Sequence, residues 1–111
     1  MTLIIRRTQG EWATKLKTSE SGQILHIDLF PIYIGRNFGC DIIINDPKVS
    51  RNHCIIEKNV IGHWTISDLD SRNGTFVERG GQNLPTPIKN TQIVKGDIIH
   101  ITPSLVSFEV L

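Results

Sequence analysis

A chain of 111 residues is long enough for one domain, because single domains most often hold about 100–150 residues. Its hydrophobic fraction of 39% and charged fraction of 21% are ordinary for a folded protein and argue against disorder. Twelve lysine and arginine residues against eleven aspartates and glutamates leave a net charge of +1. No global field therefore attracts nucleic acid or an anionic membrane, and any anion site must be local.

In chain order, residues 1–23 are expected to form edge strands around Ile4 and Trp12, as an extension of a main unit at 24–111. Within that unit, hydrophobic residues alternate with polar ones, which is typical of half-buried strands. The predicted strands cover residues 25–30, 32–34, 42–44, 54–56, 64–67, 98–99 and 106–110. No stretch shows a helical period, so we expect little or no helix.

Turn-forming residues separate these segments about every ten positions. The expected turns lie at residues 19–22, 37–39, 46–47, 70–74, 80–81, 95–97 and 102–103. Many short strands with regular turns predict an all-β sandwich or barrel. The irregular stretch from Gln82 to Thr91, with Pro85 and Pro87, is expected to be a surface loop.

Two cysteines, Cys40 and Cys54, each closely precede isoleucines, which favours two buried free thiols in a reducing compartment. The apolar stretch Thr2–Ile5 is too short for a secretion signal and is followed at once by Arg6 and Arg7. No apolar run approaches the roughly 18 residues of a membrane helix. We therefore expect a cytoplasmic location and no membrane span.

Three predicted loops each combine a backbone-shaping residue with a group able to bind an anion. They contain Gly35-Arg36, residues 47–53 and residues 71–75. Taken singly, each has an ordinary structural explanation: a surface cation, a turn hydroxyl and a hairpin turn. Loops at one end of an antiparallel sandwich gather together, so the three are expected to converge.

Together these loops resemble the forkhead-associated (FHA) family of phosphopeptide-binding domains. The resemblance rests on Gly35-Arg36, then Ser50-Arg51-Asn52-His53, then Asp68-Leu69-Asp70-Ser71-Arg72-Asn73-Gly74-Thr75, and spans roughly residue 24 to the carboxyl terminus. The chain departs from the family pattern at Glu78-Arg79-Gly80-Gly81, where the family often has Asn-Gly. The resemblance implies a β-sandwich of two twisted, mainly antiparallel sheets that binds phosphothreonine without catalysis or cofactor.

The resemblance also implies roles for individual residues. A phosphothreonine carries about −1.5 to −2 charges, and the planar guanidinium of Arg36 can engage two of its oxygens. Ser50 would donate a hydroxyl bond and Arg51 would add a second cation. Asn73 would clamp the peptide backbone through its amide, which both donates and accepts. Arg72 has two open roles, a phosphate contact or a rim charge.

Four further residues belong to the implied site. Lys48 would read the third residue after the phosphothreonine and favour an acidic or polar one. His53 is expected to be structural, bonded to backbone, rather than a general base for Ser50, since no carboxylate is obviously placed to orient it. Gly35 and Gly74 are expected to allow close backbone approach and a turn with positive φ.

The expected partner is a phosphothreonine-containing protein made by a serine/threonine kinase, and the domain is expected to be a monomer. The alternative is a phosphate-independent interaction or oligomerisation module that uses a sheet face. We expect no metal, because the cysteines and histidines lack paired ligand spacing. We expect no nucleic-acid binding, because aromatic residues make up only 6% of the chain and no basic stripe accompanies them.

Overall fold

The computed structural model describes residues 2–16, 18, 23–80, 84–102 and 105–111. Within these residues the chain forms strands and no helix, so no helix is long and apolar enough to cross a membrane. The strands are β1 (Leu3–Gln9), β2 (Ala13–Thr14), β3 (Ile24–Ile27), β4 (Ile32–Gly35), β5 (Ile42–Ile43), β6 (Cys54–Lys58), β7 (Trp64–Asp68), β8 (Thr75–Glu78), β9 (Thr86–Pro87), β10 (Asn90–Ile93), β11 (Ile98–Ile101) and β12 (Val106–Val110).

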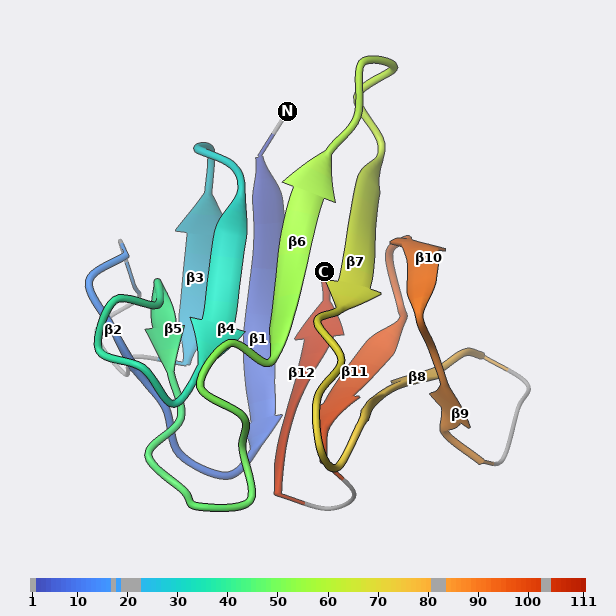
Figure 1. The fold of residues 1–111 in the computed structure, drawn as a ribbon. Coiled ribbons are helices and arrows are strands. Elements are labelled where there is room, and N and C mark those ends of the chain that lie inside the picture. Colours follow the sequence, from blue (N-terminus) through green and yellow to red (C-terminus); the bar gives the residue numbers. More distant parts are fainter. Residues whose placement is uncertain (1, 17, 19–22, 81–83, 103–104) are drawn as a thin grey trace.

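The strands form two sheets that pack face to face as a β-sandwich (Figure 1). One sheet has the order β3-β1-β12-β11-β8-β9 and the other β10-β7-β6-β4-β5-β2. All pairs are antiparallel except β4 with β5, which run parallel. The predicted sandwich of mainly antiparallel sheets is thus confirmed, and the open strand orders decide against the barrel.

The core lies between the inward faces of the two sheets. In β1, Leu3 and Ile5 are buried while Arg6 is exposed, and in β12 Val106, Phe108 and Val110 are buried. The period of two in the sequence therefore marks the buried face of each strand, as expected. Cys40 and Cys54 are also buried free thiols, as predicted, and burial raises the pKa of both.

Two expectations about the strands are wrong. The segment around Ile4 is not an edge, because β1 is hydrogen-bonded to β3 on one side and to β12 on the other; β2 does lie at an edge. Residues 82–91 are not one surface loop, because they include β9 and the first residues of β10, which pairs with β7. Pro87 is tolerated because β9 is an edge strand.

Some expected turns lie outside the described residues, namely 19–22, Gly81 and Pro103. At the lower end of the molecule in Figure 1, the connection between β1 and β2 lies beside the loops that join β5 to β6 and β7 to β8. The hairpin between β6 and β7 lies at the opposite end. The sandwich therefore brings to one end the loops that the sequence singled out.

Truncation of Phe108 tests how much this core contributes to stability, since the residue is 1% exposed and its ring centroid lies 6.0 Å from that of Trp12. Phe108→Ala should lower the free energy of unfolding by about 3–5 kcal/mol, because it removes a buried aromatic side chain and leaves a cavity. Urea unfolding of the two proteins measures the difference. Val60→Ala is the control, since Val60 is fully exposed and its truncation should change stability by less than about 0.5 kcal/mol.

Candidate functional site

The first loop begins at Gly35, where β4 ends. A side-chain carbon on Gly35 would lie 2.3 Å from the Arg51 carbonyl oxygen, so only glycine lets the two backbones come this close. There the Arg36 backbone N–H donates to the Ser50 carbonyl oxygen at 3.1 Å. The Arg36 side chain is also held, because its Nε–H donates to the Val49 carbonyl oxygen at 3.0 Å. Its terminal amino groups have no acceptor among the described residues and remain for a ligand.

The second loop, residues 44–53, wraps around this guanidinium. Ser50 Oγ accepts a hydrogen bond from the Arg72 backbone N–H at 3.0 Å, and its own O–H has no acceptor within the described part of the chain. Here lies an open pocket of about 360 Å³. It is lined by Arg36, Pro47, Lys48, Val49, Ser50, Arg51 and Arg72. This lining carries four cationic side chains and no carboxylate, so the pocket is locally positive.

The third loop, residues 69–74, is shaped by the carboxylate of Asp68. Its oxygens accept hydrogen bonds from Ser71 Oγ at 2.5 Å, the Ser71 backbone N–H at 3.0 Å and Thr75 Oγ1 at 2.7 Å. Ser71 Oγ in turn accepts from the Gly74 N–H at 3.0 Å. Burial alone would raise the pKa of Asp68, but the bonds from Ser71 and Thr75 outweigh it and lower the pKa. This ionised network fixes the turn that presents residues 72 and 73.

Asn73 lies at the edge of the pocket rather than in its lining. Its Nδ2 donates to the Lys48 carbonyl oxygen at 2.7 Å, which joins the third loop to the second. Among the described residues, its Oδ1 and second N–H have no partner, so the amide keeps one acceptor and one donor. Gly74 follows with φ of 89°, a left-handed conformation that favours glycine.

His53 is fully buried and connects the second and third loops. Its Nε2–H donates to the Gly74 carbonyl oxygen at 2.8 Å, and its Nδ1 accepts from the Ser50 backbone N–H at 3.2 Å. Burial lowers the pKa of His53, against the opposing effects of the Gly74 bond and the Asp68 charge, so the neutral ring is favoured. The Ser50 hydroxyl is bonded to Arg72 and not to His53, so the pair lacks the contact of a nucleophile with its base.

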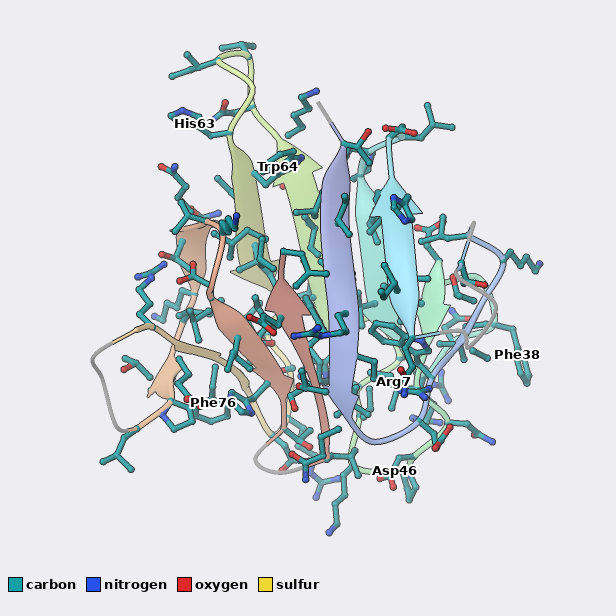
Figure 2. All side chains as sticks on the ribbon, turned by 180° about the vertical axis from the view of Figure 1, so that it is seen from behind. Arg7, Phe38, Asp46, His63, Trp64 and Phe76 are labelled. Carbon is teal, nitrogen blue, oxygen red and sulfur yellow. The ribbon has the colours of Figure 1, made fainter. Side chains whose placement is uncertain are left out.

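The structure thus brings five of the predicted binding residues, Arg36, Lys48, Ser50, Arg51 and Arg72, around one pocket and places Asn73 beside it. Sequence reasoning named Asp68 only as part of the third motif and gave it no role, although an aspartate three residues before a serine is a known signal for a side-chain-capped turn. It also missed Phe38, which is 81% exposed, points away from the fold in Figure 2, and lines an adjoining hollow of about 280 Å³ with Arg36 and Arg51.

The neutral state of His53 gives a pH prediction. Since folding lowers its pKa below 6.5, the unfolded chain binds more protons on acidification. The stabilisation from the neutral ring is therefore complete above pH 6.5 and is lost as pH falls from there through the folded-state pKa. Urea unfolding at about pH 7.5 and about pH 5 should show a drop in the free energy of unfolding.

His53→Gln is the matched variant, since an amide keeps one donor and one acceptor but does not titrate in this range. It should be less stable than the wild type by about 1–3 kcal/mol at the higher pH and should lose less stability on acidification. The other histidines contribute to the pH dependence of both proteins alike. An equal drop in the free energy of unfolding of both would therefore contradict the assignment of His53 as buried and neutral.

Comparisons with known proteins agree with this architecture. The FHA domain family model matches residues 32–102. E3 ubiquitin-protein ligase RNF8 of Bos taurus is 32% identical over 100 residues, which cover 86% of this chain and 20% of that protein. RNF8 of Homo sapiens is 30% identical over 94 residues, or 81% and 19% of the two chains. The chain therefore spans about a fifth of the length of these relatives.

Solved structures give the same result. The FHA domain of an Arabidopsis thaliana hypothetical protein superposes with a TM-score of 0.72 at 28% identity, over 98% of this chain and 83% of that one. Mycobacterium tuberculosis EmbR, solved in complex with a low-affinity phosphopeptide, gives 0.71 at 23% identity over 98% and 24% of the two chains. FHA domains are non-catalytic, phosphothreonine-dependent interaction modules. With a family model that covers most of its length and the fold in common, the chain belongs to the forkhead-associated domain family.

Proposed function

We propose that this chain binds phosphothreonine in partner proteins through the pocket between its three loops. The observation that carries the proposal is that Arg36, Lys48, Arg51 and Arg72 line, together with Ser50, one open pocket of about 360 Å³. These donors are mostly positively charged. A doubly ionised phosphate supplies the negative charge and the acceptor oxygens that complement them.

The geometry favours a different role for each of these donors. The Nε bond to Val49 holds the Arg36 guanidinium, so its two amino groups can meet a phosphate in a fork with little further ordering. Ser50 keeps its O–H free to donate, because its hydroxyl oxygen serves as the acceptor for Arg72. Arg51 and Arg72 are exposed and supply charge at the rim. Asn73 has one donor and one acceptor left for the backbone of an extended peptide.

The proposal also includes the source of the ligand, the oligomeric state of the domain and its location in the cell. A serine/threonine kinase supplies the ligand, the domain acts as a monomer in the cytoplasm, and Cys40 and Cys54 remain reduced there. Charge-assisted hydrogen bonds contribute about 1.5–3 kcal/mol each, and a flexible peptide loses entropy when it is ordered. Three or four such bonds are consistent with an affinity near micromolar, or about −8 kcal/mol.

The direct test titrates the domain with a degenerate phosphothreonine peptide library and with its dephosphorylated twin, above about pH 7 where the phosphate is mostly doubly ionised. We expect binding of the phosphorylated library alone. Equal binding of both libraries would refute the phosphate site and support the alternative, a phosphate-independent module that uses a sheet face.

Arg36→Ala should lower the affinity for phosphopeptide about 10-fold to 100-fold, because it removes the fork on the phosphate. Arg36→Lys is the matched variant, since it keeps the positive charge but cannot form the two-pronged contact with the phosphate. Its affinity should therefore lie between that of the wild type and that of Arg36→Ala. The lost bond to Val49 should lower the melting temperature by no more than about 8 °C, which calorimetry measures. Unchanged binding in Arg36→Ala would contradict the proposed pocket.

Lys48 is proposed to read the third residue after the phosphothreonine. Its side chain is exposed and makes no ion pair with any described residue, so it can turn toward a ligand carboxylate. Lys48→Glu should reverse the preference between peptides with aspartate and with lysine at that position, by about threefold to fivefold. Lys95→Glu, an equal charge change at an exposed residue between β10 and β11, should leave the preference as it is.

A further inference from the structure

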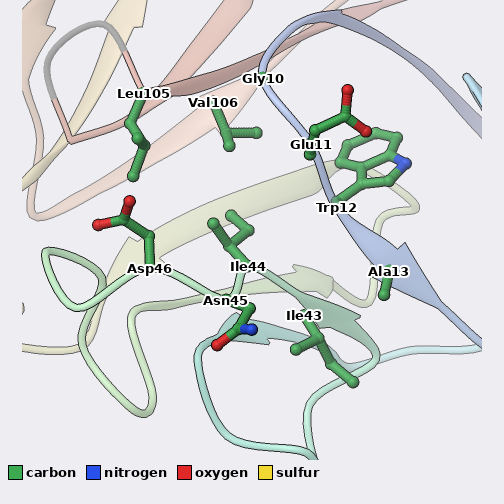
Figure 3. Close-up of a pocket in the computed structure, with 10 residues that line it drawn as sticks. All are labelled: Gly10, Glu11, Trp12, Ala13, Ile43, Ile44, Asn45, Asp46, Leu105 and Val106. Carbon is green, nitrogen blue, oxygen red and sulfur yellow. The ribbon is translucent and has the colours of Figure 1, made fainter.

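A second groove lies next to the proposed phosphate site, between the two sheets. It has a volume of about 420 Å³ and is formed by three segments that are distant in sequence: residues 10–13, 43–46 and 105–106 (Figure 3). Its walls are largely apolar; Val106 faces Ile44, and Leu105 points toward Asp46. None of these three segments carries the motif residues from which the phosphate site was deduced.

The walls of the groove are fixed by the fold. Gly10 has φ of 81°, and a side-chain carbon there would lie 2.2 Å from the Leu105 carbonyl oxygen, so the chain between β1 and β2 is pressed against the start of β12. Trp12 packs against the ring of Phe108, with centroids 6.0 Å apart, and lies 5.8 Å from the guanidinium of Arg7. The groove is therefore a preformed feature that a ligand need not open.

The charges of the groove are opposite to those of the phosphate pocket. Two carboxylates, Glu11 and Asp46, lie among its lining residues and no lysine or arginine does, within the described chain. Glu11 is 92% exposed and loosely paired with Arg7 at 3.4 Å. Asp46 accepts the Lys48 backbone N–H at 2.8 Å but forms no ion pair with a described residue. The groove thus offers largely apolar walls, the carboxylate of Asp46 without an ion pair to a described residue, and the exposed carboxylate of Glu11, which Arg7 partly balances.

The two sites adjoin along the chain, because Asp46 in the groove directly precedes Pro47 in the phosphate pocket. The loop folds back on itself here, since the Val49 N–H donates to the Asp46 carbonyl oxygen at 3.0 Å. Ser50 comes four positions after Asp46 in the chain, so their Cα atoms lie within about 14 Å. An extended ligand covers that distance in about four or five residues. Figure 2 places Asp46 at the same lower end of the molecule as these loops.

We propose that this groove is a second subsite, which takes an arginine or lysine side chain of the same phosphorylated partner within about five residues of the phosphothreonine. The inference rests on the proposed function and adds a specificity determinant to it. The methylene stem of a basic side chain suits the apolar walls, and its charged head suits a carboxylate at either end of the groove, that of Asp46 or that of Glu11. Elsewhere along the peptide the arginine-rich pocket repels a basic residue, so the preference should be confined to positions that reach the groove.

The experiment uses a phosphothreonine peptide with alanine at the flanking positions and moves one arginine along it, up to about five residues on either side. Titration of the full chain should show tighter binding, by about threefold or more, for one or two adjacent positions. Glutamate at those positions should weaken binding. Glu11→Lys should abolish the arginine gain and leave the alanine-flanked peptide bound as before, and Asp46→Asn, which keeps the acceptor for Lys48, should reduce the gain.

Glu57→Lys is the matched control, since Glu57 is an exposed carboxylate on β6 outside the groove lining and its reversal changes the net charge equally. If the alanine-flanked phosphopeptide binds but no arginine position improves binding, the groove proposal is overturned and the phosphate site stands. If no phosphorylated peptide binds, both are overturned. If sedimentation shows a dimer that Glu11→Lys makes monomeric, the groove takes a second copy of this chain, which also overturns the proposal.

Discussion

The buried imidazole of His53 determines the geometry of the binding end. One ring nitrogen accepts from the Ser50 backbone and the other donates to the Gly74 carbonyl oxygen, so a single rigid group sets the spacing of two loops. Only the neutral ring with its proton on Nε2 satisfies both bonds. Gly35 adds a second constraint, because its missing side chain lets the end of β4 approach the Arg51 backbone. The backbones of these loops are therefore already in place for the side-chain bonds from Arg36 to Val49 and from Asn73 to Lys48.

This scaffold explains how a chain with a net charge of +1 can present an anion site. Four cations surround one pocket, and the carboxylate of Asp68, which shapes the third loop, is occupied by hydroxyl and N–H donors of that turn. Its charge fixes the shape of the turn rather than neutralising the pocket through an ion pair. Preorganisation matters because ordering side chains on binding costs affinity. Arg36, held by Val49, has the least freedom to lose.

The strands could be predicted from the sequence where buried residues alternate with exposed ones. The site residues could be predicted because they lie in short sequence motifs. The prediction failed where hydrogen bonding alone makes the structure. In β10, residues 90–92 are not fully buried and only Ile93 is, so its pairing with β7 leaves little hydrophobic signal. Likewise the segment around Ile4 was expected to be an edge strand, yet β1 is paired with β12, and Arg6 forms an ion pair with Glu109 of that strand. The bond from Arg36 to Val49 and the apolar groove depend on contacts between distant segments, which no local pattern encodes.

Phosphate pocket and acidic groove together would select ligands by a difference of affinities rather than by a single strong contact. An exposed ion pair contributes at most about 1 kcal/mol, so a basic residue alone could not hold a ligand at the groove. In a flexible peptide that residue also pairs with the phosphate beside it, and binding must separate the two charges. In the proposed arrangement the domain would compensate by offering each charge its own partner, the phosphate in the pocket that Pro47 lines and the basic group in the groove that Asp46 lines. A ligand with both charges at the matching spacing gains from both sites, whereas one with the wrong spacing loses its internal pair without replacement.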